Sequence, residues 1–289
     1  MKMVYVDKEK CIRCGFCAQD CLCFTMNPGE VPSFRGELSC VRCGHCVAGC
    51  PAEAIQHRGI PSASIQPSHR QKLPEYESVM ELIRTRRSRR TFTDRPVERE
   101  LLEKILDAAI YAPSAENNQS TELVIVQNKQ VISDLVKRTI GYLTTNMKIL
   151  KNPVMGRVVQ LLYGEMLKGE NRQRLIQDIQ LLYERYMNDD DWILHHAPAV
   201  ILFHGNKQMT LAAANANLAV QNASLVVETL GLGSFYAGYL VVAAESNREI
   251  PRSLGIPTAN KIYGALAVGY PQYEYKKWIG RVNPNVKWL

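Results

Sequence analysis

The sequence predicts an α+β protein built from two unequal domains. Its 289 residues exceed the usual size of a single domain. All nine cysteines lie between Cys11 and Cys50, which places every thiol in one small module. Beyond residue 77, short apolar runs typical of strands alternate with helical patterns, as in a mixed sheet flanked by helices. We therefore expect a cysteine-rich domain over residues 1–58, a linker over 59–76 and a larger domain over 77–289.

Composition narrows the class of protein. With 46% hydrophobic and 8% aromatic residues, the chain has enough apolar side chains to bury a core. It contains no apolar run of about 18 residues, which argues against a transmembrane helix. Residues 1–7 lack the apolar stretch of a signal peptide. We expect a cytoplasmic protein with no membrane partner.

The cysteines form two copies of one motif. They read Cys11-x-x-Cys14-x-x-Cys17-x-x-x-Cys21 and Cys40-x-x-Cys43-x-x-Cys46-x-x-x-Cys50-Pro51. This is the spacing of bacterial two-cluster ferredoxins, in which the fourth cysteine of each run binds the other cluster. The motif predicts one 4Fe–4S cluster on Cys11, Cys14, Cys17 and Cys50, and a second on Cys40, Cys43, Cys46 and Cys21.

Zinc is the alternative occupant of such a module. Zinc sites use four ligands, often in two Cys-x-x-Cys pairs, and neither run supplies that set. Gly15 and Gly44 lie where the backbone passes close to inorganic sulfide, a place suited to a residue without Cβ. Cys23 is left over and is expected as a small buried hydrophobe. His45 is expected to pack or to donate a hydrogen bond.

The charge of the chain has to be judged with its cofactors. The formal charge is +7, from 35 basic and 28 acidic side chains, and such a surplus can indicate a nucleic-acid partner. Eight thiolates around two oxidised clusters would lower it to about +3. A bound cofactor phosphate would lower it further, to about +1. We therefore expect no nucleic-acid partner.

The larger domain shows both element types in order. Strand patterns occupy residues 123–126, 199–204, 234–237 and 262–268. Helical patterns occupy residues 98–111, 131–139, 156–167, 172–186 and 210–230. An earlier helix is expected to begin at a capping box formed by Ser78 and Glu81. The alanine-rich pattern at 210–230 predicts a helix that permits close backbone approach, either central or at a subunit interface.

Two segments of this domain resemble the nitroreductase family of FMN enzymes. The first is Arg86-Arg87-Ser88-Arg89-Arg90-Thr91-Phe92, and the second is Ala112-Pro113-Ser114-Ala115-Glu116-Asn117-Asn118-Gln119. Weaker matches lie at residues 231–234 and 264–271. The resemblance spans about residue 78 to the end of the chain. It is closest to the subgroup that carries an N-terminal ferredoxin domain.

The resemblance implies a homodimer with FMN at the subunit interface. The flavin phosphate and ribityl chain would be held by the basic segment, residues 84–90, through Arg86, Arg87, Ser88 and Arg90. Arginine forks suit a phosphate dianion. A solvated basic surface is the alternative for this segment.

The resemblance also implies which residues contact the ring system of the flavin. A loop of the partner subunit would lie against the ring system through Pro113, Ser114, Ala115 and Asn117. Its alternative role is a helix-ending turn in which Ser and Asn satisfy backbone groups.

Four further residues complete the expected site. Ala237 and Gly238 match the place where the family's backbone donates to flavin N5, and many relatives have Glu at the first of these. Lys277 and Arg281 would close the phosphate site. Residues 140–195 are expected either as a wall over the flavin or as plain packing. The pair His195-His196 is expected at a helix end, with proton donation as the less favoured role.

Together, these features predict an FMN-dependent reductase fed by two 4Fe–4S clusters. It would reduce nitro compounds or a related small electrophile, with electrons from a ferredoxin-type protein or NAD(P)H. FMN would carry the chemistry, so no protein residue is expected to be catalytic. Two alternatives stay open: a non-catalytic electron-transfer protein serving a partner protein, and an iron–sulfur sensor that binds nucleic acid. Reduction of an activated alkene or removal of a halogen is a variant within the enzyme class.

Overall fold

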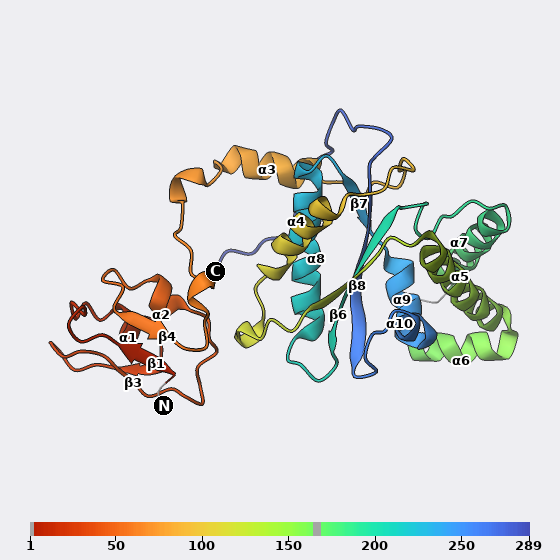
Figure 1. Ribbon diagram of the computed structural model, residues 1–289. Coiled ribbons are helices and arrows are strands. Elements are labelled where there is room, and N and C mark those ends of the chain that lie inside the picture. The colour runs from red at the N-terminus through yellow and green to blue at the C-terminus, as the bar shows by residue number, and fades with distance from the viewer. Residues whose placement is uncertain (1–2, 164–168) are drawn as a thin grey trace. The chain divides into compact units, whose positions relative to one another are not determined.

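The computed structural model describes residues 3–163 and 169–289 (Figure 1). The chain divides into two compact units, one formed by Met1–Pro74 with Glu116–Asn118 and the other by Glu75–Ala115 with Gln119–Leu289. Residues 59–75 contain two short 3-10 turns, η1 (Ser62–Ser64) and η2 (Arg70–Lys72). Side chains from residue 61 to 75 are exposed, as expected for a linker.

The first unit repeats one pattern of strand, cysteine loop, short helix and strand. β1 (Val4–Val6) pairs antiparallel with β4 (Ile55–His57), and β2 (Phe24–Thr25) pairs antiparallel with β3 (Ser33–Phe34). The helices α1 (Phe16–Asp20) and α2 (His45–Ala48) each follow a cysteine loop. β1 thus pairs with the last strand of the unit, which joins the two copies into one fold.

Gly15 and Gly44 hold equivalent positions just before the two short helices. Both have φ of 77°, in the left-handed region that favours glycine. Arg13 and Arg42 precede them with φ of 59° and 54°. The backbone turn therefore gives a reason for glycine in addition to the close approach that the sequence suggested.

The second unit is built on a four-stranded sheet with the order β5-β6-β8-β7. Its strands are β5 (Glu122–Val126), β6 (Ala199–Asn206), β7 (Gly233–Tyr236) and β8 (Asn260–Gly269). All three ladders are antiparallel, so the predicted mixed sheet is wrong for these strands. β6 and β7 are connected by a helix and run parallel to each other, but β8 lies between them in the sheet. The single parallel pairing in the described residues is an isolated bridge between Ser88 and Ser234.

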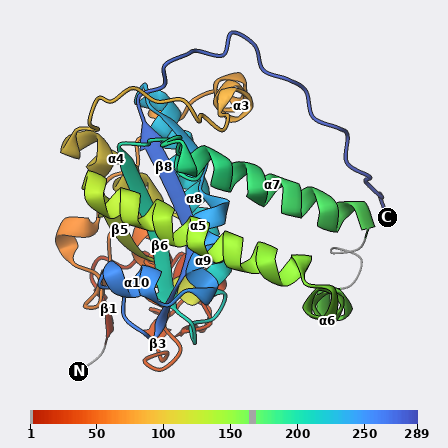
Figure 2. The ribbon, with the colours of Figure 1, turned by 90° about the vertical axis from the view of Figure 1, so that its right-hand side faces the viewer.

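Helices cover both faces of this sheet (Figures 1 and 2). Side chains of β6 alternate between two cores: Val200 and Leu202 face one, whereas Ile201 and Phe203 face the other. The second core contains α4 (Arg99–Ile110) and α8 (Ala212–Thr229), and the first contains α5 (Lys129–Lys151), α7 (Gly169–Met187) and α9 (Gly238–Ser246). The alanine stripe of α8 packs closely on the sheet: a Cβ added to Gly264 would meet Val220 Cγ2 at 2.6 Å.

Helix boundaries differ from the sequence prediction in two places. α3 (Tyr76–Thr85) begins after Glu75, so Ser78 lies inside the helix and the predicted capping box is wrong. α5 continues well beyond residue 139 because buried apolar residues recur at helical spacing through Ile140, Leu143, Met147 and Leu150. α6 (Pro153–Tyr163) covers the start of the pattern at 156–167, and residues 164–167 of that prediction lie outside the described residues. α10 (Glu249–Ser253) is a short helix before β8.

Crossing a membrane requires a helix that is both long and mostly apolar. In the described ranges, no helix combines the length and the apolar character needed to cross a bilayer.

Candidate cofactor sites

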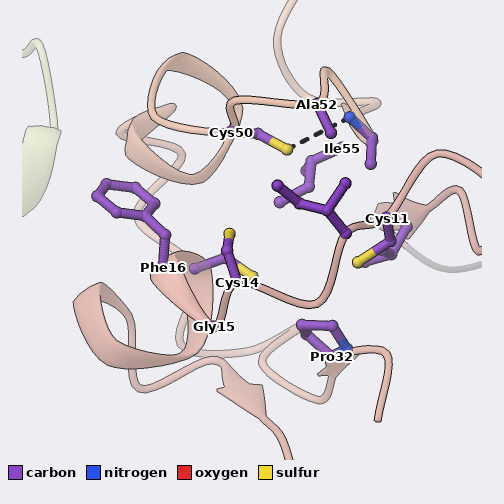
Figure 3. Close-up of a pocket in the computed structure, with 12 residues that line it drawn as sticks. Cys11, Cys14, Gly15, Phe16, Pro32, Cys50, Ala52 and Ile55 are labelled. Carbon is purple, nitrogen blue, oxygen red and sulfur yellow. Dashed lines mark hydrogen bonds between the residues drawn. The ribbon is translucent and has the colours of Figure 1, made fainter. Parts of the chain in front are cut away.

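Four cysteines line one cavity in the first unit (Figure 3). Three come from the first run and the fourth is the last cysteine of the second run: Cys11, Cys14, Cys17 and Cys50. The rest of the lining is almost entirely apolar: Val6, Ile12, Gly15, Phe16, Pro32, Ala52, Ala54 and Ile55. The fold thus gathers the four thiols that the motif assigns to one cluster. An apolar wall of this kind limits solvent access to whatever the thiols hold.

The second set also gathers, around Cys46. Burial raises the pKa of Cys46 to about 11, and the charges of Cys21, Cys43 and Cys40 add to that rise. Cys21 therefore lies among the thiols of the second run, although it belongs to the first. Cys23 is buried beside the same group, and burial raises its pKa to about 11 as well. A Cβ added to Gly36 would lie 2.2 Å from Cys23 Cβ, so Cys23 packs against backbone.

A single metal ion and an iron–sulfur cluster require different spacings between their thiol ligands. Within residues 3–163 and 169–289, no three His, Cys, Asp or Glu side chains converge closely enough to hold one metal ion. A zinc ion requires its four ligands at about 2.0–2.3 Å from one point. A 4Fe–4S cluster binds each thiolate to a different iron, so its ligands stand farther apart. The described thiols fit a cluster better than they fit zinc.

Two hydrogen bonds reach these thiols from outside the cysteine loops. The Ala54 N–H donates to Cys50 Sγ at 3.3 Å (Figure 3). The ring of His57 lies with Nε2 3.4 Å from Cys40 Sγ. Sequence reasoning did not single out His57; the available signal was a histidine soon after the last cysteine.

In the second unit, the basic segment lies beside β7. Ser88 bridges to Ser234, and the Arg89 N–H donates to the Ser234 carbonyl at 2.9 Å. Ser234 precedes Ala237 by only three residues. The basic segment and the start of α9 are therefore separated by about the length of the short strand β7. This separation suits an extended ligand with a phosphate at one end.

The arginines of the segment divide into two groups. Arg84 pairs with Glu77, and Arg89 pairs with Glu228. In the described part of the chain, Arg86, Arg87 and Arg90 form no ion pair. Arg90 is exposed and its guanidinium lies over the ring of Phe235. Three arginines and the Ser88 hydroxyl thus have charge and donors left for an anion.

The two backbone positions at the start of α9 are not equivalent. The Ala237 N–H donates to the Ala265 carbonyl at 2.9 Å. Gly238 is the first residue of α9, where an N–H has no partner within the helix. Of these two residues, Gly238 is therefore the one whose backbone N–H can donate to a ligand.

The chain after β8 returns across the basic segment. The Gln272 N–H donates to the Thr91 carbonyl at 3.1 Å, and Arg89 Nη1 donates to the Tyr273 carbonyl at 3.2 Å. The Arg84 guanidinium lies over the ring of Trp278 at 5.1 Å. These contacts bring the residues that flank Lys277 to the basic segment. Lys277 and Arg281 themselves are exposed.

The loop that includes Pro113 begins and ends on another part of the second unit, through residues up to Ala115 and from Gln119 onward. The Ala115 N–H donates to Asn215 Oδ1 at 3.1 Å, and Ser114 Oγ accepts from the Gln119 N–H at 3.0 Å. Asn117 lies in η3 (Ala115–Asn117) with φ of 51°. Asn215 is near the start of α8, whereas Glu228, the partner of Arg89, is in its last turn. Thirteen residues of helix separate these anchors by about 20 Å, so one chain does not bring the loop to the basic segment.

A comparison with known families decides what this unit is. The model of the nitroreductase family matches residues 83–270. The chain belongs to the nitroreductase family. It is accordingly an oxidoreductase. The matched range contains the basic segment from Arg84 onward, the Pro113 loop and Gly238, and it ends before Lys277.

Relatives and solved structures agree with this family. A protein of Archaeoglobus fulgidus, described as a putative NADH dehydrogenase/NAD(P)H nitroreductase, is 24% identical over 199 residues, covering 68% of this chain and 88% of that protein. A nitroreductase with bound FMN from Bacteroides fragilis superposes with a TM-score of 0.55 at 22% identity, over 72% of this chain and 97% of that one. One from Desulfitobacterium hafniense, also with bound FMN, gives 0.53 at 21% identity, over 72% and 98%. These structures share the fold of the second unit.

The two adjacent histidines of this family member occupy a turn. His195 and His196 have φ of 54° and 56°, and α7 ends earlier, at Met187, so the predicted helix-end position is wrong. Asp191 shapes the turn by accepting from the backbone N–H groups of Ile193, Leu194 and His196. His195 meets the Phe235 ring edge-on at 5.2 Å. Burial, with Arg90 nearby, lowers the pKa of His195 against the opposing effect of Asp191.

Within the segment 140–195, α5 and α7 each bury one face. Leu143 and Met147 of α5 and Ile179 and Leu182 of α7 are buried in the first hydrophobic core. The two helices lie side by side in Figure 2. These buried side chains agree with the packing alternative, and a wall over the flavin stays a prediction.

Proposed function

We propose that this oxidoreductase is an FMN-dependent reductase whose electrons arrive through two 4Fe–4S clusters. The clusters would occupy a ferredoxin-like domain at residues 1–58, followed by a linker at 59–76 and the nitroreductase domain at 77–289. The observation that carries the proposal is the cavity shared by Cys11, Cys14, Cys17 and Cys50. It lies in the same chain as a nitroreductase fold. Membership of an enzyme family favours catalysis over electron transfer to a partner protein.

The chain's own residues would bind and orient the flavin. Arg86, Arg87 and Arg90, which form no ion pair with any residue that the structure describes, would hold the phosphate together with the Ser88 hydroxyl. The Gly238 N–H would donate to the ring system. Lys277 and Arg281 would add positive charge from the C-terminal segment. A bound FMN would supply one-electron exchange with the clusters and hydride transfer to a substrate.

The proposal includes a homodimer. The Pro113 loop, with Ser114, Ala115 and Asn117, is anchored about 20 Å from the basic segment along α8. A flavin that touches both must take the loop from a second copy of the chain. Two-fold symmetry would then give two equivalent sites.

The substrate is proposed as a nitro compound or a related small electrophile. The relative from Archaeoglobus fulgidus bears a name that includes NAD(P)H nitroreductase, which supports both a nitro substrate and NAD(P)H as a donor to compare. A ferredoxin-type protein is the other donor, because cluster potentials often lie near that of a ferredoxin, at about −400 mV.

Purification without oxygen tests this function. We expect about eight irons, matching sulfide and one FMN per chain. Titration with dithionite should bleach the flavin absorbance first, because electrons pass from the clusters to the flavin, and then the cluster absorbance; a nitroarene added afterwards should restore the flavin absorbance. Iron without flavin would remove the reductase proposal. Zinc in place of iron would remove the cluster proposal.

A further inference from the structure

His57 is held with one ring nitrogen against a cluster-ligand thiol. It is the last residue of β4 and pairs with Val4 of β1. Its side chain is buried, with 5% of its surface exposed. Nε2 lies 3.4 Å from Cys40 Sγ, within the range of a hydrogen bond to sulfur. The contact links the closing strand of the unit to the first cysteine of the second run.

The other ring nitrogen decides the direction of this hydrogen bond. The Gly59 N–H donates to His57 Nδ1 at 3.0 Å. Nδ1 is therefore the acceptor nitrogen, and the proton of the neutral imidazole resides on Nε2. A Cβ added to Gly59 would lie 3.1 Å from His57 Cε1, so the turn fits closely around the ring. Nε2–H is thus aimed at Cys40 Sγ as a donor.

The two predicted clusters differ in the hydrogen-bond donors that reach their thiols. No histidine occurs in residues 1–39, so the first cysteine run has no equivalent of His57. The Ala54 N–H gives the first set a backbone donor on Cys50. Among the described residues, an imidazole donor reaches only the second set, through Cys40. Hydrogen bonds to cluster sulfur are one of the means by which a protein sets a reduction potential.

We propose that His57 raises the reduction potential of the cluster held by Cys40, Cys43, Cys46 and Cys21 above that of the other cluster. This inference rests on the proposed function. Each reduction adds one electron, and hence one negative charge, to a cluster and its thiolates, with no proton taken up. A donor aimed at Cys40 Sγ stabilises the more negative state more strongly. Of the two clusters, the second is therefore the one that is reduced first.

A redox titration of the anaerobic full-length protein with dithionite tests this, followed by visible absorbance and electron paramagnetic resonance. Beside the flavin signal, we expect two one-electron waves from the clusters, and the higher and lower waves below are those of the clusters. His57→Phe should lower the higher wave alone. At its wild-type midpoint, the ratio of reduced to oxidised cluster should fall about tenfold, equivalent to about 59 mV for one electron. His57→Gln, which keeps an N–H donor, should shift that wave less.

His45→Phe is the matched control. His45 stands within the second cysteine run, 69% exposed and 3.5 Å from Asp20, and does not contact a thiol in the described structure. It should leave both waves in place. If His45→Phe lowers the higher wave as much as His57→Phe does, the hydrogen bond is not the cause and the inference fails.

Failure of the inference can be told from failure of the proposed function. Wild-type protein without about eight irons contradicts the clusters themselves. Eight irons with unchanged waves in His57→Phe overturn only the role of His57. If that variant does not assemble, wild-type protein labelled with nitrogen-15 histidine gives the answer. The reduced second cluster should then show hyperfine coupling to one imidazole nitrogen, and its absence overturns the inference.

Discussion

Arg89 and Glu228 form an ion pair in which Nη2 lies 3.6 Å from Oε2, with only 11% and 13% of the two side chains exposed. Glu228 is in the last turn of α8, where a negative charge is disfavoured by the helix dipole. Arg89 compensates that charge. It also covers the ring of Tyr275 at 4.2 Å and donates to the Tyr273 carbonyl. This arginine of the basic segment therefore has a structural role, which separates it from its neighbours.

Removing Arg89 should destabilise the protein through Glu228. Arg89→Met leaves a nearly buried carboxylate without its partner, and we expect a loss of roughly 3 kcal/mol in the free energy of unfolding. Urea denaturation followed by circular dichroism measures this. The double variant Arg89→Met/Glu228→Met should recover much of the loss. Arg99→Met, which breaks the exposed pair with Glu103, is the control and should change little. Equal effects of Arg89→Met and Arg99→Met would contradict the structural role.

Removing Arg86 should weaken flavin binding without this cost in stability. Arg86 is half-buried and forms no ion pair among the described residues, so Arg86→Met leaves no charge stranded. Loss of a charge-assisted hydrogen bond of about 1.5–3 kcal/mol should raise the Kd of FMN about 10- to 100-fold. Quenching of flavin fluorescence measures the Kd. An unchanged Kd, with Arg99→Met as reference, would exclude Arg86 from the phosphate site.

A mixed dimer should restore flavin sites that neither parent has. Arg86→Met/Arg90→Met damages the basic segment, and Asn117→Ala damages the loop. If each site takes one element from each copy, half of randomly paired dimers are mixed and each mixed dimer has one intact site. About a quarter of all sites should then bind FMN. Co-expression with two affinity tags and flavin release measures this fraction. A fraction equal to the parents' average would place both elements in one chain.

Cys50 and Cys23 should respond differently to substitution. Cys50 lines the first cavity, so Cys50→Ala should remove one cluster and about half of the iron. Cys23 packs against Gly36, so Cys23→Ala should keep all the iron. Iron and sulfide assays on anaerobically purified protein decide between the two outcomes. Loss of iron from Cys23→Ala would reassign it as a ligand.

His195 should make the protein less stable in mild acid. Burial lowers its pKa below 6.5, so the unfolded chain takes up a proton at higher pH than the native one. Stability from this group is therefore present above pH 6.5 and is lost as pH falls through that value. The urea midpoint should drop more between pH 7.5 and 5.5 for wild type than for His195→Phe. His196→Phe is the matched control, and an identical drop in all three proteins would contradict the assignment.

The sequence by itself determined the features that depend on local spacing. Steps of three between Cys11, Cys14 and Cys17 predict thiols around one centre, because such steps wrap a single loop. Apolar periodicity predicted all four strands of the second unit, and the motif around Arg86 to Phe92 indicated its family. Local patterns gave wrong predictions where tertiary contacts decide the structure. Ser78 has the form of a cap but lies inside α3, and the strand–helix–strand pattern did not reveal β8 between β6 and β7.

Only the tertiary structure distinguished the roles of residues that look alike in the sequence. Four arginines stand at residues 86–90, but the nearness of Glu228, more than a hundred residues later, separates Arg89 from the others. His57 looks like any strand residue until the turn at Gly59 orients its ring toward Cys40. Ala237 and Gly238 differ because Ala265 accepts from the first. Such relationships join distant segments through packing and hydrogen bonds, and periodicity along the chain carries no record of them.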